Sequence, residues 1–303
     1  ITKYNHEDSL AYRSRQVTEP LTNYFVVRAQ QDINKGNTLV GGMVTATNRK
    51  INNSLRLDTL LHADAYSGGI DFTHNWKERT YYISAKTLMS HVRGSADAVA
   101  ATQTSSERFF QRPDNLHKEV DSTRRSLTGT SGTLIVGKRS GKFVFDLGTY
   151  WMSPELELND IGFLSQTDQI RQWAWLGYRI VTPKGILRWQ RYNLNQNQTW
   201  DFGGRKNGRS YNFNGHVEFT NLWAFSTGIS YQEFFVSNAD LRGGPAMHYP
   251  GYFYYWWWAG TDQRKKLSVN FNPEWQWSEN NYVRSSYYEL NINYNPINAL
   301  RIT

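Results

Sequence analysis

Tyr211–Thr220 reads YNFNGHVEFT, and Leu267–Trp277 reads LSVNFNPEWQW. In both stretches the odd positions carry mostly apolar and aromatic residues, and the even positions carry polar ones. Successive side chains of a β-strand point to opposite faces, so each stretch predicts a strand with one apolar and one polar face. The same alternation runs through Phe225–Tyr231 and Tyr66–Trp76. The alternation of apolar and polar residues, with a period of two, therefore dominates the chain and predicts an all-β protein.

Two architectures use this alternation. A soluble antiparallel sheet buries its apolar face in a core, whereas a transmembrane barrel turns that face to lipid and keeps the polar face in its lumen. The expected strands are about ten residues long, as a tilted membrane strand requires, while soluble strands average about five or six. Aromatic residues crowd the expected strand ends, as in the girdles at the two membrane surfaces. These are Tyr150-Trp151, Trp173/Trp175, Trp189, Trp223, Trp256–Trp258, Trp275/Trp277 and Tyr287-Tyr288.

The connections between the expected strands alternate between short and long. Outer-membrane barrels have short periplasmic turns on one rim and long extracellular loops on the other, whereas a soluble sandwich has no reason to separate them. The short turns are Gln31–Asn37, Lys77–Arg79, Arg139–Lys142, Thr182–Gly185, Asn221–Trp223, Thr261–Lys265 and Asn295–Asn298. The longer loops are Asn48–His62, Ser90–Arg125, Ser153–Asp168, Asn195–Ser210 and Phe234–Pro250, with a shorter one at Ser278–Tyr282. The pattern predicts a transmembrane antiparallel β-barrel of the bacterial outer membrane with about 14 strands.

The two ends of the chain do not resemble the first and last strands of a closed barrel. Ala299–Thr303 offers only the beginning of a new strand, about half of the roughly nine to eleven residues that span a bilayer. Ile1–Pro20 shows no clean alternation. An open edge in hydrocarbon leaves backbone N–H and C=O groups unpaired, so a membrane barrel must close. We therefore expect residues 1–303 to be part of a larger barrel rather than to close one alone.

Composition excludes several kinds of site. The chain has 303 residues, a net charge of +8 and no cysteine. The lack of cysteine excludes a disulfide framework, a Cys-ligated zinc site and a cysteine nucleophile. No apolar run approaches the roughly 18–20 residues of a membrane-spanning helix.

The positive charge concentrates in and beside the expected short turns. Nine basic and three acidic residues there leave this rim with +6 of the total of +8. The basic residues are Lys35, Lys77, Arg79, Arg139, Lys142, Lys184, Arg264, Lys265 and Lys266. This basic rim predicts contact with anionic lipid of the outer membrane, or docking of an acidic periplasmic or outer-membrane protein. Nucleic acid is not expected as a partner, because the basic residues mark strand ends rather than a continuous stripe.

Polar residues on the expected lumen face are the candidate binding residues. Amides and carboxylates can hydrogen-bond the hydroxyl groups of a saccharide, although such a wall suits water equally well. The candidates are Asp71, Asn212, His216, Glu218, Asn270, Asn272, Glu274, Glu289 and Asn291. Arg242 is a loop candidate, because Leu241–Ala246 holds two Gly and a Pro that suggest a tight, defined backbone. Its side chain is available to pair with a carboxylate in the barrel mouth, and loop packing alone also explains the motif.

No motif in the sequence has all the residues that a catalytic or metal-binding site requires. Gly132–Lys138 has the spacing of a phosphate-binding loop, but Arg139 follows where Ser or Thr is needed. The seven histidines are scattered singly, without the spacing of a zinc site. Ser153–Asp160 is acidic but lacks the spacing and the Gly of a calcium loop. We therefore predict no catalytic residues, no metal, no cofactor and no enzymatic activity, with a membrane hydrolase kept as a minor alternative.

Several segments resemble an uncharacterised family of Bacteroidota outer-membrane β-barrels. They are Glu19–Arg28 with Gly41–Met43, Gln111–Asp114, Ser153–Leu164 and Leu241–Pro245, and Ser153–Leu164 is the most specific. Members of that family often carry an N-terminal domain similar to carbohydrate-binding family 9, ahead of a barrel longer than this chain. The resemblance implies that such a domain and further strands lie outside this sequence. It assigns no catalytic residue.

Two functions follow as hypotheses. In the first, an outer-membrane barrel binds or passes a hydrophilic solute, with a glycan-derived one as a candidate. In the second, a barrel plugged by its own loops is an architectural subunit of an outer-membrane surface assembly or export complex. The long Ser90–Arg125 loop and the basic rim fit the second hypothesis.

Overall fold

The computed structural model describes residues 19–51, 56–297 and 300–302, which form one antiparallel sheet with its strands in chain order. The first seven strands are β1 (Leu21–Ile33), β2 (Thr38–Lys50), β3 (Asp64–Trp76), β4 (Tyr81–Arg93), β5 (Ser126–Lys138), β6 (Phe143–Met152) and β7 (Gln169–Ile180). The others are β8 (Leu187–Trp200), β9 (Lys206–Phe219), β10 (Ala224–Ser237), β11 (Met247–Gly260), β12 (Leu267–Ser278), β13 (Arg284–Ile297) and the short β14 (Leu300–Ile302). The predicted all-β class and the predicted number of strands are confirmed.

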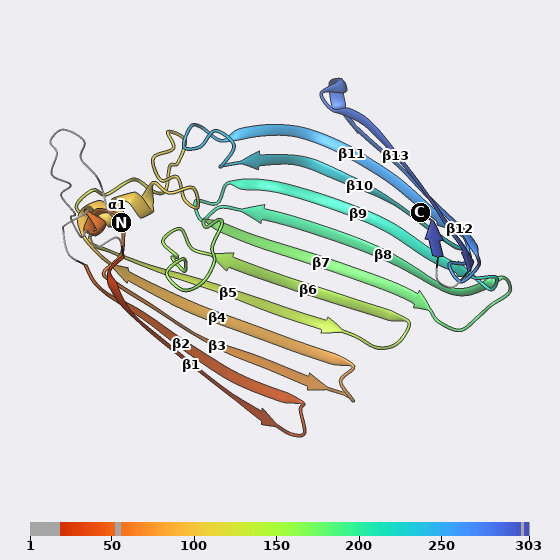
Figure 1. Cartoon of the computed structure of the whole chain (residues 1–303), viewed down its shortest axis with the longest axis horizontal. Helices are drawn as coiled ribbons and strands as arrows, with labels where there is room; N and C mark the ends of the chain where they lie inside the picture. Colours follow the sequence, from red (N-terminus) through yellow and green to blue (C-terminus); the bar gives the residue numbers. More distant parts are fainter. Residues whose placement is uncertain (1–18, 52–55, 298–299, 303) are drawn as a thin grey trace, which may run out of the picture.

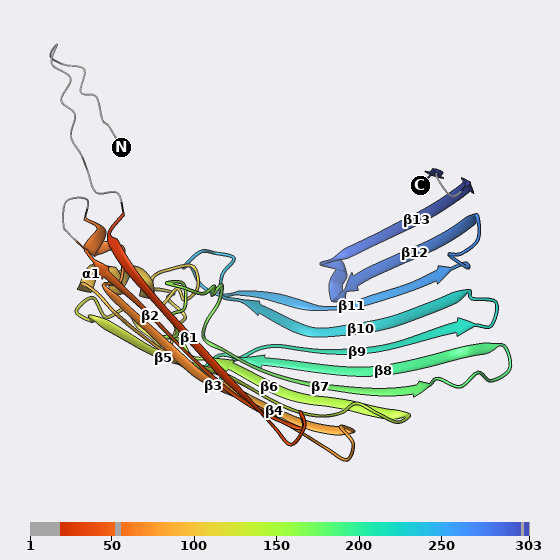
Figure 2. The same ribbon diagram turned by 60° about the horizontal axis from the view of Figure 1, so that its bottom comes forward.

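The sheet is curved into an open trough (Figures 1 and 2). Within the described ranges, β1 pairs only with β2 and β14 pairs only with β13, so the sheet does not close on itself. The expectation that this chain does not close a barrel alone is confirmed for these residues. The segment Ile1–Pro20, in which the sequence shows no clean alternation, lies outside the described residues except for Glu19 and Pro20.

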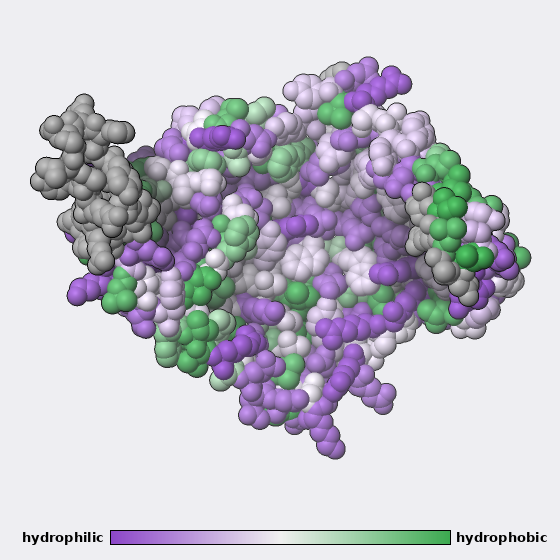
Figure 3. Space-filling model, in the orientation of Figure 1, coloured by the Kyte–Doolittle hydropathy of each residue, from purple (hydrophilic) through white to green (hydrophobic). Residues whose placement is uncertain are grey.

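The register of the strands gives the sheet one apolar and one polar face. Phe213 of β9 lies opposite Leu194 of β8 and Ile229 of β10, and these side chains are 53%, 48% and 43% exposed. Asn212 lies opposite Asn195 and Ser230 on the other face. The polar face is the concave one, and hydrophilic side chains gather in its hollowed middle (Figure 3). We call the polar face the concave face and the apolar face the convex face.

The two rims differ in the length of their connections. On one rim the turns are residues 34–37, 77–80, 139–142, 181–186, 220–223 and 261–266, and on the other lie the loops 51–63, 94–125, 153–168 and 238–246. Nearly all the predicted short turns and most of the predicted long loops are confirmed.

Two predicted connections are wrong. Asn195–Ser210 is not a long loop, because β8 continues to Trp200 and β9 begins at Lys206. Around Asn195 both faces of β8 carry amides, so the apolar half of the period-two signal disappears although the strand continues. The last predicted turn is also misplaced, since β13 continues to Ile297, and Asn298 lies outside the described residues.

Two of the long loops fold onto the concave face beside β4 and β5. They comprise residues 94–125, which include the helix α1 (Ala96–Gln103), and residues 153–168, and together we call them the loop cap. The buried guanidinium of Arg108 forms a 2.8 Å ion pair with Glu157 and so ties one loop to the other. Val99 of α1 packs with Val92 and Leu127 of the sheet. In the described part of the chain no helix is long and apolar enough to cross a membrane.

Gly129 of β5 sits directly beneath the loop cap. A Cβ atom at this position would lie 2.2 Å from the backbone nitrogen of Leu156. We therefore expect Gly129→Ala to displace the loop and to lower the free energy of unfolding by about 1–3 kcal/mol. Gly42→Ala is the matched control, because its Cβ would meet only the Gly69 carbonyl at an ordinary 3.6 Å. Equal stability of the two variants in denaturant titrations would contradict this packing.

Candidate functional site

The concave face holds all nine polar residues that the sequence predicts for a lumen. The register places Asp71 on β3, three residues on β9, three on β12 and two on β13, all with the same facing. The β9 residues are Asn212, His216 and Glu218, and the others are Asn270, Asn272, Glu274, Glu289 and Asn291. They do not converge on one point. Most of them form two groups on the wall, separated by β10 and β11. Asp71, Glu218 and Asn270 lie apart from both groups, since Glu218 pairs with Arg188 and Asn270 accepts a hydrogen bond from Gln263.

The first group is a network of asparagines across β8 and β9, which we call the amide ladder. Asn193 Nδ2 donates to Asn214 Oδ1 at 2.6 Å, and Asn195 Nδ2 donates to Asn212 Oδ1 at 3.0 Å. Asn214 in turn donates to Asn212 Oδ1 at 2.5 Å. Because the amides hold one another, the ladder presents hydrogen-bonding groups with fixed orientation.

His216 extends the amide ladder toward β10. One ring nitrogen, Nε2, lies 2.9 Å from Asn214 Oδ1, and the other, Nδ1, lies 2.9 Å from the hydroxyl of Ser226. Both nitrogens therefore have polar partners on the wall. This arrangement fits a structural member of a polar network rather than a catalytic base.

The second group lies on β12 and β13. Asn272 stands opposite Glu289 in the register. Asn272 Nδ2 donates to Glu274 Oε1 at 3.1 Å, and Asn291 Nδ2 donates to Glu289 Oε1 at 2.9 Å. Among the side chains that the structure describes, no Lys or Arg forms an ion pair with either glutamate. This part of the wall therefore carries two carboxylates that attract cations and hydroxyl donors.

Tryptophans on the concave face are functional candidates that the sequence analysis missed. It assigned Trp173 and Trp256 to girdles at strand ends, but both share the facing of the polar residues, and Trp173 lies near the middle of β7. Trp173 stands opposite Gly148, and a Cβ there would lie 2.1 Å from the indole. Trp256 likewise stands opposite Gly228. Each indole ring therefore packs against the backbone of a glycine, which has no side chain to keep the ring away.

One indole joins the amide ladder directly. Trp175 Nε1 donates to Asn193 Oδ1 at 3.0 Å, and Arg191 Nε donates to the same oxygen at 3.0 Å. An indole beside fixed amides is an arrangement suited to a ligand with both apolar and hydroxyl-bearing surfaces. A usable signal in the sequence was the spacing of Arg171, Trp173 and Trp175, which puts the two indoles on the same face as a charged residue.

Asp71 lies at a separate cavity of about 420 Å³ between the sheet and the loop cap. Lys86 and Thr47 also line this cavity, and the buried Thr47 Oγ1 has no hydrogen-bond partner among the residues that the structure describes. Arg28 Nη2 of β1 lies 3.3 Å from the Asp71 carboxylate. The structure thus brings Asp71 to a charged corner of a cavity, and not to the amide ladder.

Comparison with known proteins is informative at the level of the family. A family model described as a domain of unknown function, DUF5916, matches residues 2–303. The chain belongs to the DUF5916 family. No curated protein matches it. Membership agrees with the expectation of an uncharacterised family and adds no residue roles to this DUF5916 chain.

Arg242 lies in the tight loop that the sequence predicts. The backbone of Arg242 has φ +49° and that of Gly243 has φ +100°. Two turn hydrogen bonds, Arg242 N–H to the Ala239 carbonyl at 2.9 Å and Gly244 N–H to the Leu241 carbonyl at 3.0 Å, hold the loop. Within the described residues Arg242 takes part in no ion pair, so the expected pairing with a carboxylate is not found and loop packing explains the motif.

Charged side chains hold the loop cap to the sheet. Asp160 accepts hydrogen bonds from Arg49 of β2 and from His62, whose Nδ1 lies 3.0 Å away. Burial raises the pKa of the Asp160 carboxyl, but the hydrogen bonds and charges of His62 and Arg49 outweigh it and hold this pKa below its usual value. A carboxyl with a lowered pKa stabilises the folded state above its unfolded pKa of about 3.9, and this contribution is lost as the pH falls through the folded value.

We expect Asp160→Asn to lower the free energy of unfolding at pH 7 by about 1–3 kcal/mol, because Arg49 loses its partner. The deficit relative to the parent chain should shrink as the pH falls below about 4, where the carboxyl is protonated first in the unfolded state and at lower pH in the folded state. Denaturant titrations between pH 3 and pH 7 measure this difference in the free energy of unfolding. Glu119→Gln, at an exposed position of the same cap, is the control and should change stability by less than about 0.5 kcal/mol. A deficit that grows toward low pH would contradict the ion pair.

Proposed function

We propose that this DUF5916 chain forms part of the wall of a transmembrane β-barrel in a bacterial outer membrane, and that its concave face binds or passes a hydrophilic solute. One observation carries the proposal. The convex face carries many large apolar side chains that remain exposed, while the concave face carries most of the polar ones. In water such a surface would cost about 25 cal/mol for each Å² of apolar area, and lipid removes that cost. The exposed convex residues include Ile70, Leu134, Leu147, Leu176, Phe213, Leu290 and Ile292.

The rims support the same placement. All nine basic residues of the basic rim are exposed, as a contact with anionic headgroups requires. Short turns on that rim and long loops on the other follow the pattern of outer-membrane barrels, with the short turns toward the periplasm. The resemblance to Bacteroidota barrels points to the outer membrane of such a bacterium.

The chemistry of the wall favours a hydroxyl-rich solute. The amide ladder offers oriented donors and acceptors, Glu274 and Glu289 offer acceptors, and Trp175 offers an apolar surface beside them. Glycan-derived molecules combine hydroxyl groups with apolar ring faces and so fit this wall. Nothing in the arrangement supplies a nucleophile with a base, so we do not propose an enzyme.

A second candidate function rests on the loop cap. The cap lies on the concave face and is fixed by the Arg108–Glu157 ion pair and by the Asp160 cluster. A cap held this firmly fits a plugged barrel that is an architectural subunit of a surface assembly or export complex. The basic rim would then dock an acidic partner protein.

Phe213→Arg tests the facing of the wall. Phe213 lies near the middle of β9 on the convex face, and an arginine there should lower the stability of the membrane-inserted protein by about 2–4 kcal/mol. Ser230→Arg, at the same level on the concave face, should cost less than about 1 kcal/mol because its side chain meets water. Unfolding titrations in phospholipid vesicles compare the two. A larger loss for Ser230→Arg would invert the facing and argue for a soluble sheet.

Single-channel recording of the full-length protein separates the two functions. An open lumen should conduct and prefer cations, and Glu274→Gln with Glu289→Gln should reduce that preference because both carboxylates line the wall. Glu119→Gln removes one carboxylate from the cap instead and should change selectivity less. A protein that inserts in bilayers without conducting would support the plugged, architectural candidate.

A further inference from the structure

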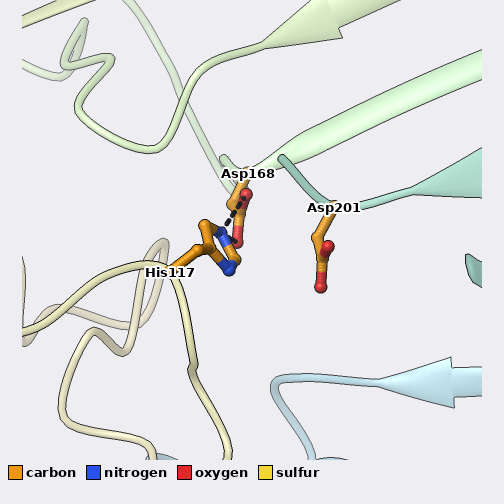
Figure 4. Close-up of side chains that lie close together, drawn as sticks. All are labelled: His117, Asp168 and Asp201. Carbon is orange, nitrogen blue, oxygen red and sulfur yellow. Dashed lines mark hydrogen bonds and ion pairs between the residues drawn. The ribbon is translucent and has the colours of Figure 1, made fainter. Parts of the chain in front are cut away.

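One histidine and two aspartates from three different connections meet at the long-loop rim (Figure 4). His117 belongs to the loop between β4 and β5, Asp168 ends the loop between β6 and β7, and Asp201 begins the connection between β8 and β9. Their ligand atoms all lie within 4.8 Å of one another. His117 Nε2 lies 2.9 Å and 3.0 Å from the two oxygens of Asp168. No sequence motif joins them, because they are far apart along the chain.

Both carboxylates are buried and already oriented by the protein. Asp168 and Asp201 are only 6% and 3% exposed. The Phe202 N–H donates to Asp168 Oδ1 at 2.9 Å, and the Arg205 N–H donates to Asp201 Oδ1 at 2.8 Å. Each carboxylate oxygen has a second lone pair beyond these bonds. Outer hydrogen bonds of this kind fix the ligands of protein metal sites.

Two neighbouring arginines offset part of the negative charge of the two acids. Arg205 Nε contacts Asp201 Oδ2 at 3.1 Å, but its Nη1 is committed to Asp114 at 2.8 Å. Arg112 is buried nearby, yet its Nε and Nη1 have no hydrogen-bond partner within the described residues. The charge of Arg112 attracts both Asp168 and Asp201 and offsets part of the repulsion between the two carboxylates, and a cation bound by both would offset it further.

The pair of His62 and Asp160 shows what a purely structural histidine looks like in this chain. His62 Nδ1 lies 3.0 Å from Asp160, and its Nε2 lies 2.8 Å from the hydroxyl of Thr102. Both ring nitrogens are occupied, and no second carboxylate completes a ligand group there among the described residues. Asp201 is the feature that distinguishes the cluster around His117.

We propose that His117, Asp168 and Asp201 bind a divalent transition-metal ion of the zinc class. Imidazole nitrogen and carboxylate oxygen are the ligand types that Zn²⁺ accepts, and three protein ligands leave a fourth position for water. The bound ion joins three connections of the long-loop rim and so holds them together. This assignment is independent of the solute that the concave face takes.

Isothermal titration of the EDTA-treated, full-length protein in detergent with ZnCl₂ tests the proposal. We expect one Zn²⁺ per chain, and affinity at least about tenfold weaker for His117→Gln and for Asp201→Asn. His62→Gln is the matched control and should keep the parent affinity. Zinc should also raise the melting temperature of the parent chain but not that of the two ligand variants.

Zinc-edge X-ray absorption gives a readout that does not depend on the variants folding. The parent protein should show a ligand shell of one imidazole nitrogen with carboxylate and water oxygens. The absence of saturable Zn²⁺ binding by the parent chain would overturn the proposal. So would a loss of affinity in His62→Gln as large as that in His117→Gln.

Discussion

The antiparallel hydrogen-bond register between consecutive strands is the constraint on which the rest of this molecule depends. Because side chains alternate strictly along each strand, one register fixes the facing of every residue on the sheet. Phe213 and Asn212 are neighbours in sequence, yet they face opposite surroundings, and their cross-strand partners Ile229 and Ser230 follow the same division. A slip of one residue would exchange an apolar face for a row of amides. The amide ladder and the convex surface thus share one origin.

Sequence reasoning succeeded where only one face of a strand is polar. Tyr211–Thr220 and Leu267–Trp277 have that form, and the structure has β9 and β12 there. It failed at Asn195–Ser210, where amides occupy both faces and erase the pattern that marks a strand. Backbone pairing does not require an apolar side chain, so two strands continue through a segment that looks like a loop.

The loop cap and the cluster around His117 could not be predicted from spacing. Arg108 and Glu157 come from different loops, as do His117 and Asp201, and only the fold brings each pair together. The facing of Trp173 could have been predicted from the sequence, because Trp173 lies two residues from the charged Arg171 and therefore on the same face of the strand. Its place against Gly148 depends on the register between β6 and β7, which single-strand patterns do not contain.

The order of strands has a consequence for how the protein assembles. Each of the thirteen adjacent strand pairs in the described part of the chain is formed by two strands that are consecutive in sequence. Pairing can therefore proceed from one hairpin to the next, and each new strand finds its template already formed. The entropic cost of closing a connection rises slowly with its length, so even residues 94–125 delay the pairing of β4 with β5 only modestly. At every step the growing sheet has one new edge for the next strand, while within the described residues the outer edge of β1 stays unpaired.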